Sequence, residues 1–429
     1  MKIAILILLT IIPPTLACKV VYSITQYSNS TEVYKAECET ENAHYPLSFN
    51  TSFIEEQLSH SLNVEEDNPH YTENTGVKGN KALLVVRVMA PDASTSISSE
   101  KLSQSVFGDT SARSQYSDCS FKKLNFHPAT GPGVSNGVME ITIPQNVKGI
   151  SSYVVQNAIT EKLGGKPLNA DHVMYCLPPG TTGGWIAYAY TNHWLSVYND
   201  KWCTYLSAQM HEIGHNFGLL HSGEDKTAYG DQSGYMGYSY GVENGPLMCF
   251  NGPKSWQLGW YMDKTRSMSA AKREKYEGSI SGIVDYATTT LPVIIRLQTE
   301  DSKDVFVMYN KKDKFNVGTK EGPHQVLVTT AVGNNVYGSS TLLSKMDVGQ
   351  SFTLPNNYTI DVISRNDEDG IKISIKPGNC SYDPNCRPPV CRLTTQDCWD
   401  IKSLLKAPKP NTGSKDKYKS STVRRNFTY

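Results

Sequence analysis

The residues most able to do chemistry lie in one short run, HEIGHNFGLLH. His211 and His215 are four residues apart, so on a helix both imidazoles project from the same face. Glu212 lies beside the first histidine and can reach a water molecule on a metal without ligating it. Gly218 tolerates the left-handed backbone of a sharp helix exit, after which His221 can swing back as a third ligand. Three neutral imidazoles leave the fourth tetrahedral position of Zn²⁺ open, which is typical of catalytic sites.

The alternative interpretation of this run is an amphipathic helix whose histidines only decorate its surface. In this composition the five fixed positions coincide by chance in roughly 1 chain in 10⁵, which argues against that alternative. A zinc ion would lower the pKa of its bound water to about 7 and polarise a carbonyl. Glu212 would take the proton from that water and deliver it to the leaving amine. The other histidines have no ligand spacing and are expected to be structural or surface residues: His44, His60, His70, His127, His172, His193 and His324.

A methionine follows the motif in the glycine-rich run GDQSGYMGYSY. HExxHxxGxxH with a downstream methionine turn is the zincin pattern called metzincin, and Met236 would then form an apolar floor under the imidazoles. Met248 suits the turn less well, because the glycine-rich approach precedes Met236. Tyr238 stands two residues after Met236. It is expected either to touch the metal or the transition-state oxyanion, or to be a packing tyrosine.

The elements that must position these residues can be read from apolar periodicity. Helical spacing predicts helices at residues 102–107, 152–163 and 205–218. Buried or alternating runs predict strands at residues 82–88, 138–143, 172–176 and 185–189. Because strands and helices alternate, we expect a mixed sheet with helices packed on it.

Beyond residue 275 the helical signals end, and short β-type runs are separated by Gly, Asn and Asp turns. This spacing predicts a β-sandwich-like domain over residues 269–378. The expected class is therefore α+β, with a metzincin-like zincin catalytic domain at 81–268. A cysteine-rich segment and a basic tail at 379–429 would follow the sandwich. The bland interpretation of that tail is a solvated disordered segment, and the sharper one is a contact with acidic wall or matrix polymers.

The N-terminus has the layout of a secretory signal peptide over residues 1–17, with Lys2, a short apolar core and small residues before the cleavage point. Residues 18–80 are expected to hold a β-hairpin, as part of a prosegment, and an acidic linker. No later run is apolar enough for a membrane anchor. The protein is thus expected to be secreted, and five sequons fit a glycoprotein: Asn29, Asn50, Asn357, Asn379 and Asn426.

The chain has ten cysteines, an even number that favours disulfide bonds in a secreted protein. Cys18 and Cys38 could join the open ends of the hairpin. Cys176 and Cys203 flank one predicted strand and the start of the metal helix, so a bond between them would brace the site. None of the cysteines forms a CxxC pair, which argues against a cysteine metal site.

Four runs together resemble the gametolysin family of secreted metallopeptidases. They are SQYSDCSFKKLNF, GGWIAYAY, QMHEIGHNFGLLHS with YGDQSGYMGYSY, and FNGPKSWQLGWY. The resemblance covers residues 81–265 well and residues 275–378 more thinly. It implies a zinc endopeptidase that acts on extracellular glycoproteins such as cell-wall or matrix proteins. One departure concerns latency: Cys38 lies in KAECET without the arginine and glycine of a PRCG-like cysteine switch, so we expect it in a disulfide.

The metzincin resemblance also implies a substrate-binding strand. In metzincins an edge strand just before the metal helix pairs with the extended substrate backbone. This role would fall here to Trp185, Ile186 and Ala187. The alternative is an ordinary interior strand, which the sequence does not exclude.

The charge balance of the 429 residues limits the possible partners. Basic and acidic residues number 41 each, so the net charge is zero and nothing in the whole chain favours a nucleic-acid binder. With 39% hydrophobic residues the chain can build cores. The expected partner is a protein or peptide substrate. The competing hypothesis is a catalytically inactive wall-binding or adhesion glycoprotein that keeps the fold, although an intact Glu212 argues against it.

Overall fold

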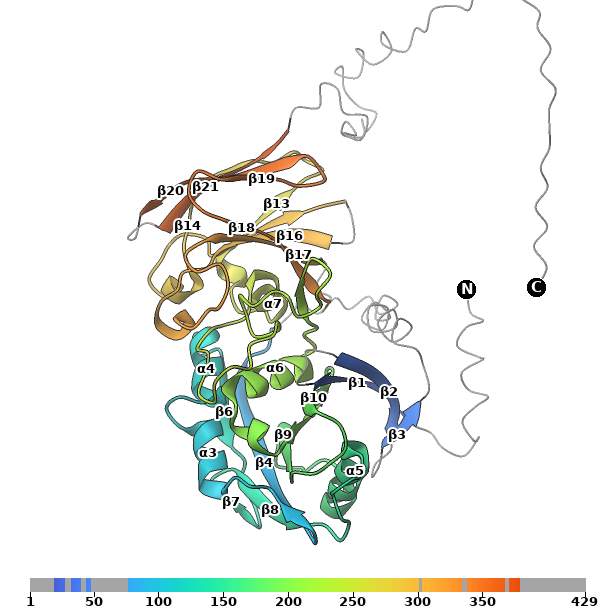
Figure 1. The fold of residues 1–429 in the computed structure, drawn as a ribbon. Coiled ribbons are helices and arrows are strands. Elements are labelled where there is room, and N and C mark those ends of the chain that lie inside the picture. The colour runs from blue at the N-terminus through green and yellow to red at the C-terminus, as the bar shows by residue number, and fades with distance from the viewer. Residues whose placement is uncertain are drawn as a thin grey trace, which may run out of the picture. The chain divides into compact units, whose positions relative to one another are not determined.

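The computed structural model describes residues 19–27, 32–39, 44–47, 76–300, 303–333, 338–366 and 370–378 (Figure 1). It is a mixed α+β structure with three sheets and few helices. The predicted signal peptide, Cys18, most of the acidic linker and the cysteine-rich segment with the basic tail lie outside the described residues.

The largest sheet has eleven strands, and nine of them follow the order β3-β2-β1-β10-β11-β9-β4-β8-β7. The strands are β1 (Lys19–Tyr27), β2 (Glu32–Glu39), β3 (His44–Leu47), β4 (Gly79–Ala90), β5 (Ala93–Ser94), β6 (Leu124–Pro128), β7 (Val134–Ser135), β8 (Val138–Thr142), β9 (His172–Leu177), β10 (Trp185–Tyr190) and β11 (Leu195–Asn199). Strands β5 and β6 both pair with β4. The run β11-β9-β4-β8 is parallel, whereas β10 is antiparallel to both of its neighbours, β1 and β11.

Both faces of this sheet are covered, because alternate residues of its central strands enter different cores. In β4, Leu83 and Val85 pack into a core with α3 (Ser99–Phe107), α4 (Ala112–Cys119) and α6 (Leu206–Asn216). Leu84 and Val86 pack on the opposite side with α5 (Ser152–Leu163). Because both faces of the sheet are covered, β9 and β10 are buried at every position. Strands of this kind have nearly continuous apolar sequences.

The helices predicted from periodicity are present. The helix over residues 152–163 has the expected bounds and ends at Gly164, whose φ of 70° is the left-handed conformation that glycine favours. Helix α4 was missed because its sequence, ARSQYSDC, is mostly polar. Ser111 and Ser114 form a capping box at its start. Gln115 is buried beside Ala112, Tyr116 and Cys119, and it donates hydrogen bonds to the carbonyls of Met248 and Phe315.

The remaining strands form two smaller sheets, with orders β12-β18-β17-β16-β15-β13 and β14-β21-β20-β19. Their bounds are β12 (Ser222–Glu224), β13 (Thr265–Ser269), β14 (Tyr276–Ile280), β15 (Ile294–Gln298), β16 (Lys303–Tyr309), β17 (Val326–Val332), β18 (Ser340–Met346), β19 (Ser351–Thr353), β20 (Tyr358–Asn366) and β21 (Gly370–Pro377). The short helix α7 (Gly252–Gln257) precedes β13. Val307 and Val328 from one sheet share a core with Ile360 and Ile373 from the other, as a two-sheet sandwich requires.

The N-terminal hairpin expected from alternation is formed by β1 and β2, but it is not a separate unit. Strand β1 pairs with β10 over five residue positions, so the hairpin extends the largest sheet. The contact includes a buried polar link: Glu37 on β2 accepts a hydrogen bond of 2.6 Å from the Tyr190 hydroxyl on β10. Glu39 accepts one of 2.7 Å from His193 in the next turn.

Two disulfides join distant parts of the described chain. Cys176 and Cys203 are bonded, as predicted from their positions beside one strand and the start of α6. Cys119 and Cys249 form a second bond that sequence alone did not indicate. Cys38 is also disulfide-bonded, so it is no free thiolate. Among the described residues, no helix combines the length and apolar character needed to cross a bilayer.

His172 gives the core a measurable pH dependence. Its ring is buried against Phe126 and Phe217, and burial lowers its pKa from 6.5 to about 4. His172 is therefore protonated below pH 6.5 in the unfolded chain, but only below about pH 4 in the folded chain. Above pH 6.5 the His172 side chain adds no pH dependence to the free energy of unfolding. Between pH 6.5 and pH 4 it lowers the free energy of unfolding progressively, by about 3 kcal/mol at pH 4.

We expect His172→Phe to flatten the loss of unfolding free energy between pH 7 and pH 4 by about that amount. Urea unfolding of both proteins across this pH range is the measurement. His127→Phe, at an exposed position, is the control. Parallel stability curves for His172→Phe and the wild type would contradict the assignment.

Candidate metal centre

Helix α6 carries two of the motif histidines and ends where the third must turn back. Gly218 has a φ of 89°, and its N–H donates to the carbonyl of His215 at 2.8 Å. The N–H of Leu219 donates to the carbonyl of Gly214 at 3.0 Å. These are the two bonds of a Schellman motif, which ends a helix and reverses the chain direction. The glycine therefore has the role that the sequence predicted for it.

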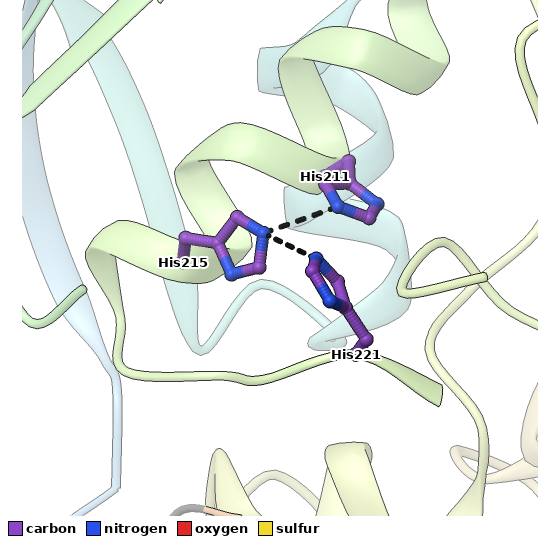
Figure 2. Close-up of side chains that lie close together, drawn as sticks. All are labelled: His211, His215 and His221. Carbon is purple, nitrogen blue, oxygen red and sulfur yellow. Dashed lines mark hydrogen bonds between the residues drawn. The ribbon is translucent and has the colours of Figure 1, made fainter. Parts of the chain in front are cut away.

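Three imidazoles converge beyond this turn, as Figure 2 shows. The Nε2 atom of His215 lies 3.1 Å from that of His211 and 3.0 Å from that of His221. All three side chains are buried, with exposed fractions of 1–2%. Ligand nitrogens around a tetrahedral zinc ion, at 2.0–2.1 Å each, stand about 3.3 Å apart. The separations of the Nε2 atoms thus fit a shared metal ion.

The protonation of the rings supports the same interpretation. Nδ1 of His211 donates to the carbonyl of Tyr235, and Nδ1 of His215 to that of Leu219, both at 2.7 Å. Because a carbonyl only accepts, each Nδ1 carries the proton and each neutral ring presents a lone pair at Nε2. The pKa of His215 is well below its usual value. Burial is the largest cause, and the neighbouring His211 and His221 add to it. Lone pairs facing one another without a proton fit a cation between them.

Glu212 is buried beside the triad, with an exposed fraction of 1%. Neither of its carboxylate oxygens has a hydrogen-bond partner within the described part of the chain. Burial raises the pKa of this carboxyl well above its usual value. A buried, unsatisfied carboxyl is costly to keep, so a functional role for it has a physical rationale.

Met236 packs directly against the metal helix. A Cβ atom placed on Gly214 would lie 2.8 Å from the Met236 sulfur, so only glycine at position 214 lets the methionine approach this closely. The carbonyl of Met236 accepts a hydrogen bond of 2.9 Å from the N–H of Ser222, the residue after His221. The methionine therefore contacts both the helix and the strand that follows the third histidine.

Three tyrosines of one run lie at different positions relative to the triad. Tyr238 is half-buried, and its ring contacts Tyr240 at 5.2 Å between centroids. Within the described chain its ring contacts none of the three histidines. Tyr240 instead lies 5.8 Å from His211, and Tyr229 lies 4.1 Å from His221. Sequence reasoning missed Tyr229 and Tyr240, because only the offset from Met236 was used and both lie in the same tyrosine-rich run.

Strand β10 contains Trp185, Ile186 and Ala187, the residues expected to bind substrate. All three are buried, with exposed fractions of 0–3%. In this structure β10 is not an edge strand, because β1 pairs with it on one side and β11 on the other. The edge that a substrate would need is thus covered by the N-terminal hairpin. Periodicity did not reveal this, because strand pairing is a non-local property.

Helix α6 also makes hydrogen bonds to the largest sheet. The N–H of Asn192, in the turn after β10, donates to the carbonyl of His215 at 2.9 Å. The side-chain amide of Asn216 donates to the carbonyls of Tyr190 and Leu195 at 3.0 and 2.8 Å. The end of α6, at His215 and Asn216, is therefore joined by these three hydrogen bonds to β10, to β11 and to the turn between them.

Comparison with known proteins identifies the same region. Residues 90–289 match the family model described as gametolysin peptidase M11. A stretch of 92 residues is 35% identical to a protein named Autolysin from Chlamydomonas reinhardtii. This stretch is 20% of the present chain and 14% of that protein, so the chain spans far less than two thirds of this relative. Peptidases of the M11 family are generally metal-dependent.

Proposed function

We propose, on the premise that residues 90–289 belong to the gametolysin peptidase M11 family, that the protein is a zinc-dependent endopeptidase. Its substrates would be extracellular proteins of the cell wall or matrix. The observation that carries the proposal is the convergence of three buried Nε2 atoms from His211, His215 and His221. Three nitrogen ligands favour zinc over the hard cations that prefer oxygen.

The chain's own residues divide the chemistry between them. His211, His215 and His221 would hold the zinc ion, which would supply Lewis acidity for the activation of water and the polarisation of the scissile carbonyl. Glu212 acts as the general base that removes the proton from the attacking water, and then delivers it to the departing amine nitrogen. Its burial and raised pKa suit a group that holds a proton between these two steps. Met236 closes the apolar floor of the site.

The proposed donor to the developing oxyanion is a tyrosine. Tyr238 is the candidate given by its offset from Met236. Tyr229 and Tyr240 join it as candidates, because their rings contact His221 and His211. A hydroxyl held within hydrogen-bond reach of the oxyanion stabilises the transition state more than the ground state.

Substrate recognition is proposed to use the backbone of β10 at Trp185, Ile186 and Ala187. An extended peptide would add to this strand by β-augmentation. Because β1 occupies that edge in the full chain, the proposal requires the hairpin of β1 and β2 to leave or to be removed. The N-terminal segment would then act as a prosegment that keeps the site closed until it is displaced.

The location follows from the same proposal. We place the protein outside the cell, as the predicted signal peptide, the sequons and the disulfides favour. The basic tail remains a proposed contact with acidic wall polymers. The alternative, an inactive wall-binding or adhesion glycoprotein, is separated from the peptidase by the experiment below.

The test measures metal content and cleavage together. The purified, processed protein is expected to hold about one zinc per chain, and to cleave a denatured protein in a reaction that a chelator stops and added zinc restores. His215→Ala should lose both the zinc and the activity. His127→Ala, an exposed histidine outside the triad, should keep both. A protein without bound transition metal would overturn the site, and zinc without cleavage would favour the alternative.

A further inference from the structure

The strand that follows the third histidine does not belong to the largest sheet. Residues 222–224 form β12, which is an edge strand of the C-terminal six-stranded sheet. It pairs in parallel with β18, with Ser222 opposite Ser340. The pairing begins at the metal ligand itself, because the N–H of Ser340 donates to the carbonyl of His221 at 3.0 Å.

A buried cluster of polar side chains fixes this junction. It consists of Ser222, Asp231, Asn251 and Ser340, all with exposed fractions of 0–2%. The hydroxyl of Ser222 donates to Oδ2 of Asp231 at 2.7 Å, and the Asn251 amide donates to the same oxygen at 2.8 Å. Oδ1 of Asp231 accepts from the N–H of Ser233 at 3.0 Å and from its hydroxyl. The buried carboxylate is therefore fully satisfied.

Proton counting assigns a definite role to Ser340. Its oxygen lies 2.7 Å from that of Ser222. Because the single proton of Ser222 goes to Asp231, Ser340 must be the donor in this contact. Without the Ser340 hydroxyl, Ser222 loses one of its donors in a site that is closed to bulk water. The Asn251 amide, which donates to Ser222 at 2.7 Å, would be the donor that remains.

The segment just before β18 also accepts a hydrogen bond from α7. Lys254 in α7 is fully buried, and its ammonium donates to the carbonyl of Gly338. Burial lowers the pKa of this lysine to about 7, and the nearby Asp231 opposes that shift. At the other end of β12, Lys345 bridges Glu224 and Glu321 at 2.7 and 2.5 Å. The strand after His221 is thus bonded to the C-terminal sheet along its whole length.

We infer that β18 of the C-terminal sheet is part of the metal centre, and that Ser340 and Asp231 are positioning residues for His221. The inference rests on the proposed metal function of the triad. It assigns the C-terminal sheet a role that a separable wall-binding module would not have. Residues that orient metal ligands from outside the coordination sphere typically change metal affinity by about 10–100-fold when they are replaced.

The test compares zinc affinities of full-length variants by competition with a chromogenic chelator. Ser340→Ala is expected to raise the dissociation constant for zinc by about 10–100-fold. At saturating zinc it should lower kcat with little change in KM, because the substrate strand is untouched. Ser344→Ala is the matched control. It lies on the same strand, and its hydroxyl makes no hydrogen bond within the described chain.

Two further measurements separate positioning from general loss of structure. Ser340→Thr keeps the hydroxyl and is expected to bind zinc more tightly than Ser340→Ala. The metal-free form of Ser340→Ala should still unfold in one cooperative transition, at a temperature only a few degrees below that of Ser344→Ala. If Ser340→Ala does not fold, Asp231→Asn is measured in the same way and should show the same loss of affinity. Equal zinc affinity in a folded Ser340→Ala and the wild type overturns the inference, whereas a wild type that binds no zinc overturns the proposed function instead.

Discussion

Glu212→Gln is expected to slow the cleavage of a denatured protein by about 10²–10⁴-fold, the range typical for loss of a general acid–base group. Glutamine has nearly the same shape, but it cannot take a proton from water at neutral pH. The three imidazoles would be unchanged, so the bound zinc should remain at about one per chain. Measurement of kcat, KM and metal content on the same preparation gives the result. Glu161→Gln, on the exposed side of α5, is the matched control.

The two failures of this prediction have different meanings. If Glu212→Gln cleaves as fast as the wild type, the proposed base is wrong while the metal site can stand. If the variant also loses its zinc, Glu212 contributes to the coordination or to the local fold. Only a large loss of kcat with zinc retained supports the division of labour that we propose.

Loosening the N-terminal hairpin is expected to speed cleavage by up to about 100-fold. The carbonyl of Tyr22 accepts from the N–H of Thr191, so β1 residues at even numbers direct their backbone polar groups toward β10. Ile24 is the next even-numbered residue of β1. It lies opposite Ala189, and its side chain is 1% exposed. Ile24→Pro removes one ladder bond and the burial of an isoleucine side chain. The loss of about 3 kcal/mol corresponds to about 100-fold in the docking equilibrium.

The test measures the rate of substrate cleavage together with the hydrogen exchange of the β10 backbone amides. Cleavage of a denatured protein by Ile24→Pro should be faster than by the wild type, and the amide hydrogens of β10 should exchange faster with solvent. Thr25→Ala loses only the contact of 2.8 Å with the Tyr153 hydroxyl and serves as the milder control. If Ile24→Pro keeps its fold and its activity falls, then the hairpin is a permanent part of the enzyme and the substrate does not bind at β10.

Local patterns in the sequence predicted the parts of the site that depend on local geometry. The spacing of His211 and His215 on one helix face, and the glycine exit before His221, involve residues within one or two turns of each other. The bounds of α5 were predicted for the same reason, since apolar period and a glycine stop are read from neighbouring residues.

Pairing between distant segments could not be predicted in this way. The neighbour of β10 is a strand about 160 residues earlier in the chain, and nothing in the run around Trp185 specifies which strand covers it. The partner of β12 is 118 residues later. Helix α4 was not predicted because it is short: only Ala112, Tyr116 and Cys119 are apolar on its buried face, and the fourth buried position is the hydrogen-bonded Gln115. The Cys119–Cys249 bond likewise depends on the fold and not on spacing.

The tyrosines illustrate a third limit. An offset of two residues from Met236 selects Tyr238, yet a ring's position depends on how the turn is packed. Tyr238 donates its N–H to the carbonyl of Tyr229 at 3.0 Å, and this contact places Tyr229 over His221. Counting residues along a turn cannot show which of its aromatic rings contacts the three histidines.

The pairing of β12 with β18 sets the order in which the protein can become competent during its synthesis. Ser340 is encoded 119 residues after His221. At the usual translation rate of about 5–20 residues per second, roughly 6–24 seconds separate the two residues on the ribosome. Throughout that interval the nascent chain has the three histidines of the proposed site but lacks the strand that pairs with the residues after His221. Full hydrolytic activity would then appear only after the strand that contains Ser340 has been made and has paired with β12.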